Sequence, residues 1–321
     1  PWSSSTVYNG IAEGNWLRKN IRKSYIKHTE EEIIDYLLYN DRYLLLESGT
    51  VADNFAHTYG GAISSSGAAE SIMYIGHEGS GNKMTIDNNR SNKAGGAIYS
   101  NTNSPIVIYG NAVFSKNETQ SIGGAIYTGG GLTIRNTQFI GNVSATSGGA
   151  VYHNYSIPGT HQRILELTNC EFTGNAGVYG GAVALNANAA SEDVGTYAVI
   201  TNCTFTKNSS ISVDGQSGSG GAIYATHNAE ATIQGSIFKG NVSGSVAGAV
   251  TVHGGSKVSI TDTQFEDNTG VYGGALNVAP GSTATFNRVN FVGNKANFNA
   301  AGGGGNGGAL YASDATITLK S

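Results

Sequence analysis

Apolar and polar residues alternate in short runs along most of this chain. Leu132-Thr133-Ile134, Leu165-Glu166-Leu167 and Val258-Ser259-Ile260 are examples, and a glycine, asparagine or aspartate soon follows most runs. A period of two is typical of β-strands that bury one face. Because strands this short cannot fold alone, the pattern predicts many strands that pair with one another.

The runs recur together with a motif, Gly-Gly-Ala followed by Ile, Leu or Val. Successive copies start 25 to 40 residues apart, and a degenerate copy, Ala247-Gly248-Ala249-Val250, fills the one gap. Adjacent glycines indicate a place where backbones approach more closely than a side chain would allow. The glycine pairs are Gly60-Gly61, Gly95-Gly96, Gly123-Gly124, Gly148-Gly149, Gly180-Gly181, Gly220-Gly221, Gly273-Gly274 and Gly307-Gly308.

A second motif, Phe-x-x-Asn, precedes most of these glycine pairs. Two earlier repeats carry an aliphatic residue instead of Phe: Ile86 before Asn89, and Val51 before Asn54. We expect the phenylalanines to stack in a buried column. We expect the asparagines to form a ladder at a corner, each side-chain amide bonding to the next. The pairs are Phe114/Asn117, Phe139/Asn142, Phe172/Asn175, Phe205/Asn208, Phe238/Asn241, Phe265/Asn268 and Phe291/Asn294.

A turn-forming residue stands three positions before most motif phenylalanines. Such residues tolerate the positive φ that a sharp corner requires. They are Asn111, Asn136, Asn169, Asn202, Gly235 and Asp262.

These elements together predict an all-β fold, a single-stranded right-handed parallel β-helix in which each coil pairs with the coils before and after it. We expect about nine coils over residues 47–321, each with three strands. The pattern is still present at residues 315–319, so we interpret the chain as a fragment truncated at the C-terminus of the solenoid.

Residues 1–46 lack the repeat. Thr29 and Glu32 form a capping box before an apolar stretch, which predicts a helix over about residues 30–40, and an earlier helix is expected around Trp16–Tyr25. Residues 42–47 are expected to form a strand. We interpret the segment as an N-terminal cap that covers the open end of the solenoid, with a linker or separate module as the alternative.

Composition and charge narrow the function. The net charge is −4 and only 12% of residues are charged, so no basic footprint for nucleic acid is present. The seven histidines lack the spacing of a metal site, and the acids are scattered, with Glu192-Asp193 and Asp262/Glu266/Asp267 as the nearest groupings. We therefore expect no catalytic residues, no cofactor and no metal.

The two cysteines stand at equivalent positions of neighbouring repeats. Cys170 and Cys203 each lie two residues before a motif phenylalanine, which places them one strand spacing apart. That separation suits a disulfide, although parallel stacking often gives unsuitable side-chain directions. A disulfide and two buried thiols both remain open.

The two motifs, repeated in fixed order, resemble the paired signature of the chlamydial polymorphic membrane proteins over about residues 51–311. This resemblance implies a β-helical passenger that is exported by an autotransporter route, is anchored by a C-terminal β-barrel and adheres to host cells. The sequence shows no such barrel and has an unusual helical start. A membrane contact is therefore expected only through an anchor outside this fragment.

Tyrosine often follows the aliphatic residue of the glycine motif. If that aliphatic residue points inward, the tyrosine points outward. We expect an exposed column that contacts a partner, or that only stabilises the sheet. Its members are Tyr99, Tyr127, Tyr152, Tyr224 and Tyr311.

The sequence thus favours an adhesin at the cell surface, displayed from an outer membrane, with a host cell-surface protein or glycan receptor as partner. The alternatives are a structural stalk or self-association module and, less favoured, a polysaccharide-degrading β-helix enzyme.

Overall fold

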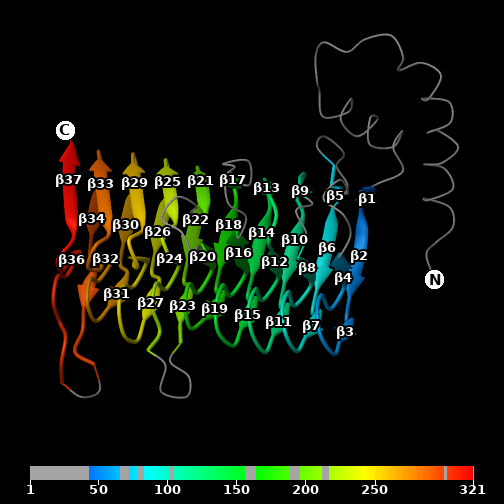
Figure 1. Cartoon of the computed structure of the whole chain (residues 1–321), viewed down its shortest axis with the longest axis horizontal. Helices are drawn as coiled ribbons and strands as arrows, with labels where there is room; N and C mark the ends of the chain where they lie inside the picture. The colour runs from blue at the N-terminus through cyan, green and yellow to red at the C-terminus, as the bar shows by residue number, and fades with distance from the viewer. Residues whose placement is uncertain are drawn as a thin grey trace, which may run out of the picture.

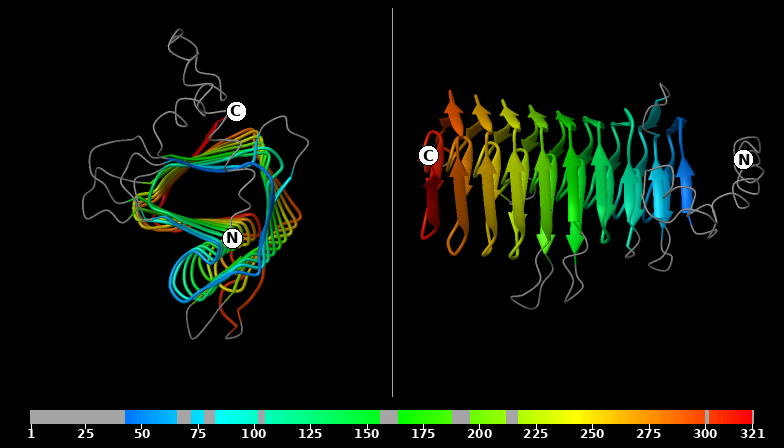
Figure 2. Two further views of the ribbon diagram at one scale, coloured as in Figure 1. Left: turned by 90° about the vertical axis from the view of Figure 1, so that its right-hand side faces the viewer. Right: turned by 90° about the horizontal axis from the view of Figure 1, so that it is seen from above.

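The computed structural model is a parallel β-helix whose coils stack along one axis (Figure 1). It describes residues 43–65, 72–77, 83–101, 105–155, 164–187, 196–211, 217–299 and 302–320. The expected N-terminal helices lie outside the described residues, whereas the expected strand at residues 42–47 is present as β1 (Tyr43–Leu46). Viewed along the axis, successive coils superpose around one continuous interior (Figure 2).

The first sheet has ten parallel strands. In register order they are β1, β5 (Ile72–Ile75), β9 (Ile106–Ile108), β13 (Leu132–Arg135), β17 (Ile164–Thr168), β21 (Tyr197–Thr201), β25 (Glu230–Gln234), β29 (Lys257–Thr261), β33 (Thr283–Asn287) and β37 (Thr316–Lys320). Alternate residues of these strands point into the core, as the period of two predicts.

The second sheet carries the motif phenylalanines on nine strands. They are β2 (Gly49–Ala52), β6 (Met84–Asp87), β10 (Val113–Ser115), β14 (Gln138–Ile140), β18 (Glu171–Thr173), β22 (Thr204–Thr206), β26 (Ile237–Lys239), β30 (Gln264–Glu266) and β34 (Asn290–Val292).

The third sheet consists of two-residue strands that follow the motif asparagines. They are β3 (Phe55–Ala56), β7 (Arg90–Ser91), β11 (Glu118–Thr119), β15 (Val143–Ser144), β19 (Ala176–Gly177), β23 (Ser209–Ser210), β27 (Val242–Ser243), β31 (Thr269–Gly270) and β35 (Lys295–Ala296).

The fourth sheet begins with the aliphatic residue of the glycine motif. Its strands are β4 (Ile63–Ser65), β8 (Ile98–Ser100), β12 (Ile126–Thr128), β16 (Val151–Tyr155), β20 (Val183–Ala187), β24 (Ile223–Thr226), β28 (Val250–Val252), β32 (Leu276–Val278) and β36 (Leu310–Ala312). The expectation of three strands per coil was therefore wrong. Pairs of residues without an apolar alternation form the third sheet, and that pattern is too short to be recognised.

The motif phenylalanines form the predicted column in the core. Six of them, from Phe114 to Phe265, are fully buried, and successive rings from Phe114 to Phe291 are stacked with centroids 4.7–5.0 Å apart. This distance equals the spacing of paired strands, so the register of the sheet sets the stacking.

The motif asparagines form the predicted ladder, in which the amides are buried and hydrogen-bonded. Asn142 Nδ2 donates to Asn175 Oδ1 at 2.9 Å and to the carbonyl of Phe114 in the preceding coil at 3.0 Å. The Asn142 Oδ1 in turn accepts from Nδ2 and from the backbone N–H of Asn117. A short side chain whose amide both donates and accepts makes all these bonds, which explains why asparagine recurs at this position.

The last rung of the ladder is less buried than the others. Asn294 is the last motif asparagine of this sequence, so its amide bonds only to the preceding coils. Asn294 still accepts from the Asn268 Nδ2 at 2.9 Å and donates to the Phe265 carbonyl at 2.8 Å. However, Asn294 and Phe291 are half-buried rather than fully buried. The physical reason is that β34 is the outermost strand of the second sheet, so no described coil covers this rung.

The two glycines of each pair serve different purposes. Gly123 has φ +70°, a conformation that L side chains rarely adopt. Gly124 has an ordinary φ, but a Cβ there would overlap the carbonyl oxygen of Gly149 and lie 2.7 Å from the backbone of Val143. The second glycine thus lies where the segment that leads into the fourth sheet crosses the third sheet of the next coil; we call this place the glycine crossing. The degenerate copy keeps this second glycine, as Gly248.

The tyrosine column exists, but it is not exposed, so the expectation of an outward contact strip was wrong. Tyr99, Tyr127 and Tyr152 are stacked on one another and are each less than a tenth exposed. They pack in a second, smaller core, because the segment before each glycine pair folds over the outer face of the fourth sheet, as at Ala94 and Ile122.

Nearly every coil supplies one tyrosine to this second core from one of two positions. One position directly precedes the glycine pair, and the other follows the aliphatic residue. Eight of the nine coils have a tyrosine at one position and none has it at both: Tyr59, Tyr99, Tyr127, Tyr152, Tyr179, Tyr224, Tyr272 and Tyr311. Tyr59 stacks on Tyr99, and Tyr179 packs against Tyr224, so the two positions supply the same row of rings. Tyr224 was expected in the exposed column and is instead half-buried.

His153 is a polar side chain inside the main core. It is fully buried, and its Nε2 donates to the carbonyl oxygen of Gly130 at 3.0 Å. Its Nδ1 has no partner among the described residues. Burial lowers the pKa of His153 to about 4, because the charged imidazolium is poorly solvated there.

If each coil has room for one tyrosine ring at either of the two positions, moving the ring from one position to the other should restore stability; we call this the one-tyrosine rule. Tyr127→Ala removes a buried ring and should lower the free energy of unfolding by about 3 kcal/mol. Ile122→Tyr alone should overpack the second core and cost about 1–3 kcal/mol. The double variant moves the ring to the other position and should recover at least half of the Tyr127→Ala loss. Urea unfolding of the four proteins measures the cycle, and additive losses would contradict the rule.

The buried His153 predicts acid sensitivity. Its pKa is about 4 in the folded chain and 6.5 when unperturbed, so the unfolded state binds the proton more tightly. The stability contribution is complete above pH 6.5 and is lost as the pH falls toward 4; between pH 7.5 and 5 the loss should be about 2 kcal/mol.

The matched control is His153→Leu, because Leu185 occupies the equivalent position in the next coil. Unfolding free energies of both proteins at the two pH values isolate the contribution of His153. An equal pH dependence of the two proteins would show that His153 titrates normally.

Candidate functional site

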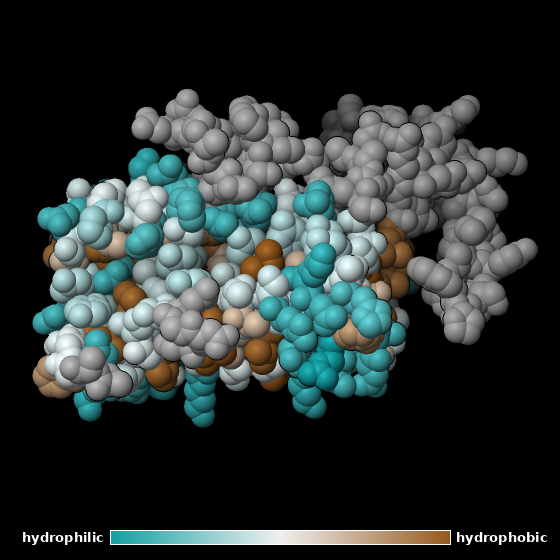
Figure 3. All heavy atoms as spheres, turned by 60° about the horizontal axis from the view of Figure 1, so that its bottom comes forward, coloured by the Kyte–Doolittle hydropathy of each residue, from teal (hydrophilic) through white to brown (hydrophobic). Residues whose placement is uncertain are grey.

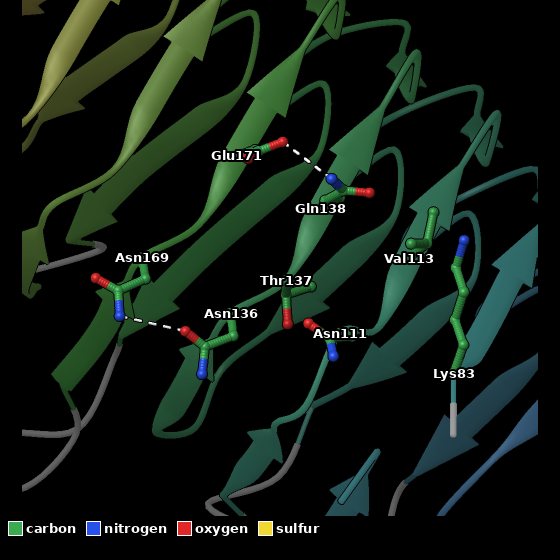
Figure 4. A pocket seen from close by; sticks show the side chains of 8 residues that line it. All are labelled: Lys83, Asn111, Val113, Asn136, Thr137, Gln138, Asn169 and Glu171. Atoms are coloured by element: carbon green, nitrogen blue, oxygen red, sulfur yellow. Dashed lines mark hydrogen bonds between the residues drawn. The ribbon is translucent and has the colours of Figure 1, made fainter. Parts of the chain in front are cut away.

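A polar groove of about 380 Å³ crosses four coils where the first sheet turns into the second (Figure 4). It is formed by β10, β14 and β18, by the corners that precede them and by Lys83, which directly precedes β6. The residues that line it are Lys83, Asn111, Val113, Asn136, Thr137, Gln138, Asn169 and Glu171.

One side of the groove is a row of corner asparagines. Asn111, Asn136 and Asn169 have φ values of 61°, 51° and 53°, which confirms that the turn-forming residues take positive φ. This backbone conformation directs their exposed amides outward at every coil. The Asn169 Nδ2 donates to the Asn136 Oδ1 at 3.2 Å, so the row is partly ordered before any ligand arrives.

The other side consists of outward residues of the second sheet. Val113, Gln138 and Glu171 pair in register on neighbouring strands. The Gln138 Nε2 donates to the Glu171 Oε2 at 3.0 Å. The buried Thr137 forms part of the floor, and its hydroxyl donates to the carbonyl of Arg135.

The groove is close to neutral, since Lys83 and Glu171 are the only charged residues among the described ones that line it. Glycosidases that follow the usual mechanism need two carboxyl groups beside the scissile bond. A single carboxylate hydrogen-bonded by Gln138 does not provide that pair. The arrangement is suited to hydrogen bonding of a polar, uncharged ligand.

The acidic grouping singled out in the sequence is separated into ion pairs. Asp262 accepts two bonds from Arg288, at 2.6 and 2.7 Å, and Glu266 accepts one from Lys239 at 2.8 Å. The hydrogen bonds from Arg288 lower the pKa of Asp262. These pairs join neighbouring coils, and Glu192-Asp193 lies outside the described residues. Within the described part of the chain, no three His, Cys, Asp or Glu residues group as metal ligands.

The two cysteines are free thiols on neighbouring coils, and both are buried. Each Sγ donates to the carbonyl of the residue two positions before it, Thr168 for Cys170 and Thr201 for Cys203. The hydrogen bond with Cys170 and burial raise the pKa of the Cys203 thiol well above its ordinary value. Cys203 is therefore a protonated, buried thiol of low reactivity, and both cysteines pack in the main core.

The motif residues are not accessible to a partner. The ladder asparagines from Asn89 to Asn268 are fully buried, including the five in Asn-x-Ser/Thr sequences: Asn89, Asn117, Asn142, Asn208 and Asn241. The terminal rung, Asn294, is half-buried, and both ends of its amide are bonded to the preceding coils. Recognition must therefore use outward positions.

The sequence did not reveal the groove. It pointed to the corner asparagines only as turn formers, and the two sides of the groove come from different parts of the repeat. The recurrence of asparagine at Asn111, Asn136 and Asn169 was the one available signal, and turn formation alone accounts for it.

The face in Figure 3 has hydrophilic residues gathered over the N-terminal coils, with apolar residues scattered among polar ones elsewhere. Among the exposed apolar side chains, Ile140 lies on one coil, and Ile237 and Val242 lie on another coil, on different sheets. Scattered exposed apolar residues are ordinary for a soluble surface and do not by themselves mark an interface. None of the described elements is a helix of the length and apolarity needed to cross a membrane.

Comparison with known families identifies a repeat at four places in the chain. The Chlamydia polymorphic membrane protein repeat matches residues 83–101, 111–129, 136–154 and 202–226. No curated protein and no solved structure matches the chain.

The matched segments correspond to the structural repeat. Three begin at or beside a corner residue, Asn111, Asn136 or Asn202, and all four run through the second, third and fourth sheets. They contain both the asparagine ladder and the glycine crossing, the two features that hold neighbouring coils in register. The chain therefore carries repeats of the chlamydial polymorphic membrane protein type.

Proposed function

We propose that this chain is an adhesive passenger rod, displayed at the cell surface from an outer membrane, that attaches to host cells through a protein or glycan receptor. The chlamydial polymorphic membrane protein-type repeats and the parallel β-helix fit a surface passenger domain. The repeat match is the observation that carries the proposal, because this repeat family consists of surface proteins.

The construction of the rod supports an adhesive role. The asparagine ladder and the phenylalanine column continue through successive coils, so the scaffold is rigid and presents outward side chains at fixed intervals. Because the motif side chains are buried, they maintain the coil and the outward residues contact the partner.

An enzymatic role is less well supported. The polar groove contains one carboxylate, and the acids Asp262 and Glu266 are engaged in ion pairs. A polysaccharide-cleaving site of the usual kind needs two suitably spaced carboxyl groups. We therefore propose that the chain binds without catalysis.

Binding to cells tests the proposal. Fluorescently labelled chain should bind cultured epithelial cells saturably, and an excess of unlabelled chain should displace it. The negative control is Gly124→Leu. Its side chain collides with the backbone of the next coil and should disrupt the local fold and abolish binding. Flow cytometry over a concentration series measures both.

The other candidate functions give different results. Absence of saturable binding, together with self-association in sedimentation velocity, would favour a structural stalk instead. Release of reducing ends from a polysaccharide panel would favour an enzyme.

A further inference from the structure

The polar groove has the features of a site for a short carbohydrate. We propose that it binds a neutral oligosaccharide segment, with the corner asparagines Asn111, Asn136 and Asn169 as the contact row. This inference rests on the proposed adhesive function and specifies the chemistry of one receptor contact.

The amides of the groove are oriented before binding. Asn169 uses its Nδ2 to bond the Oδ1 of Asn136, which leaves the Asn136 Nδ2 and the Asn169 Oδ1 directed away from that bond (Figure 4). Gln138 likewise donates its Nε2 to Glu171 and keeps its Oε1 available. Donors and acceptors therefore alternate along the groove, which suits hydroxyl groups because each can donate and accept.

The charges favour a neutral ligand. Lys83 and Glu171 carry opposite charges, and no second cation is among the described residues that line the groove. Sulfated, phosphorylated or uronate ligands are usually held by several Arg or Lys side chains. The groove volume of about 380 Å³ lies near the lower end of the range for small-ligand sites, which suits a short ligand.

An extended peptide is disfavoured because the backbone under the groove has no free edge. The amide N–H of Gln138 bonds the Ala112 carbonyl at 3.0 Å, and that of Glu171 bonds the Thr137 carbonyl at 3.0 Å. Strand addition needs unpaired backbone groups, which these central strands do not offer. A ligand here must be recognised by side chains, and their coil-to-coil spacing is about 4.8 Å.

The chain itself provides a conservative substitution for the contact row. Gly235 occupies the same corner position, and glycine tolerates positive φ. Asn136→Gly/Asn169→Gly therefore removes two amides while leaving the corner unstrained. Asn202→Gly is the matched control, because Asn202 has the same conformation in the next coil but does not line the groove.

The test is an NMR titration of the folded chain with cellotetraose, maltotetraose and chitotetraose, with tetragalacturonate as the acidic counterpart. At least one neutral probe should shift the side-chain amide signals of Asn111, Asn136 and Asn169 saturably. The double variant should weaken that binding by on the order of tenfold or more, and Asn202→Gly should leave it unchanged.

The inference is overturned if no neutral probe shifts these amides, if the double variant binds as tightly as the native chain, or if tetragalacturonate binds best. Cell binding of the same variants separates this inference from the proposed function. If the double variant binds cells as well as the native chain does, the groove is not a receptor contact, and the proposed adhesion is unaffected. A chain that binds a neutral probe in the groove but no cells would support the groove and refute adhesion.

Discussion

The structure depends on a buried ladder of asparagine amides. A buried amide without partners is costly, and every rung between the ends is satisfied only by the coils on either side. A shift of register by one residue would leave these amides unpaired and would move the phenylalanine column out of the core. The ladder therefore fixes the stacking of all four sheets, and the side chains that point outward inherit that order.

The glycine pairs and the tyrosines follow from the same constraint. Once the coils are in register, the fourth sheet crosses the third at a distance that excludes a Cβ at Gly124 and its equivalents. The segment before the crossing lies over the fourth sheet and has room for one large ring per coil. Tyr99 and Tyr179 illustrate the two ways to supply that ring, from the strand or from the covering segment.

Within each repeat, the residues that maintain the fold are different from the residues that could contact a partner. The residues that define the family are buried and shared by nearly all coils, so they carry little information about a partner. Outward positions vary from coil to coil. The corner row shows this variation: it is asparagine at Asn111, Asn136 and Asn169, glycine at Gly235, and an ion pair between Asp262 and Arg288 further along. The polar groove is one local result of that variation.

The sequence by itself determined the coil. Phe-x-x-Asn, the glycine pairs and the alternating strands identify the repeat, its register and its parallel pairing, because each is a local pattern repeated at a regular spacing. Only the tertiary structure decided what each outward position faces. The third sheet was missed because two-residue strands carry no period. Tyr99, Tyr127 and Tyr152 were expected at the surface because alternation gives the direction of a side chain but not what covers it, and here the preceding segment of chain covers them.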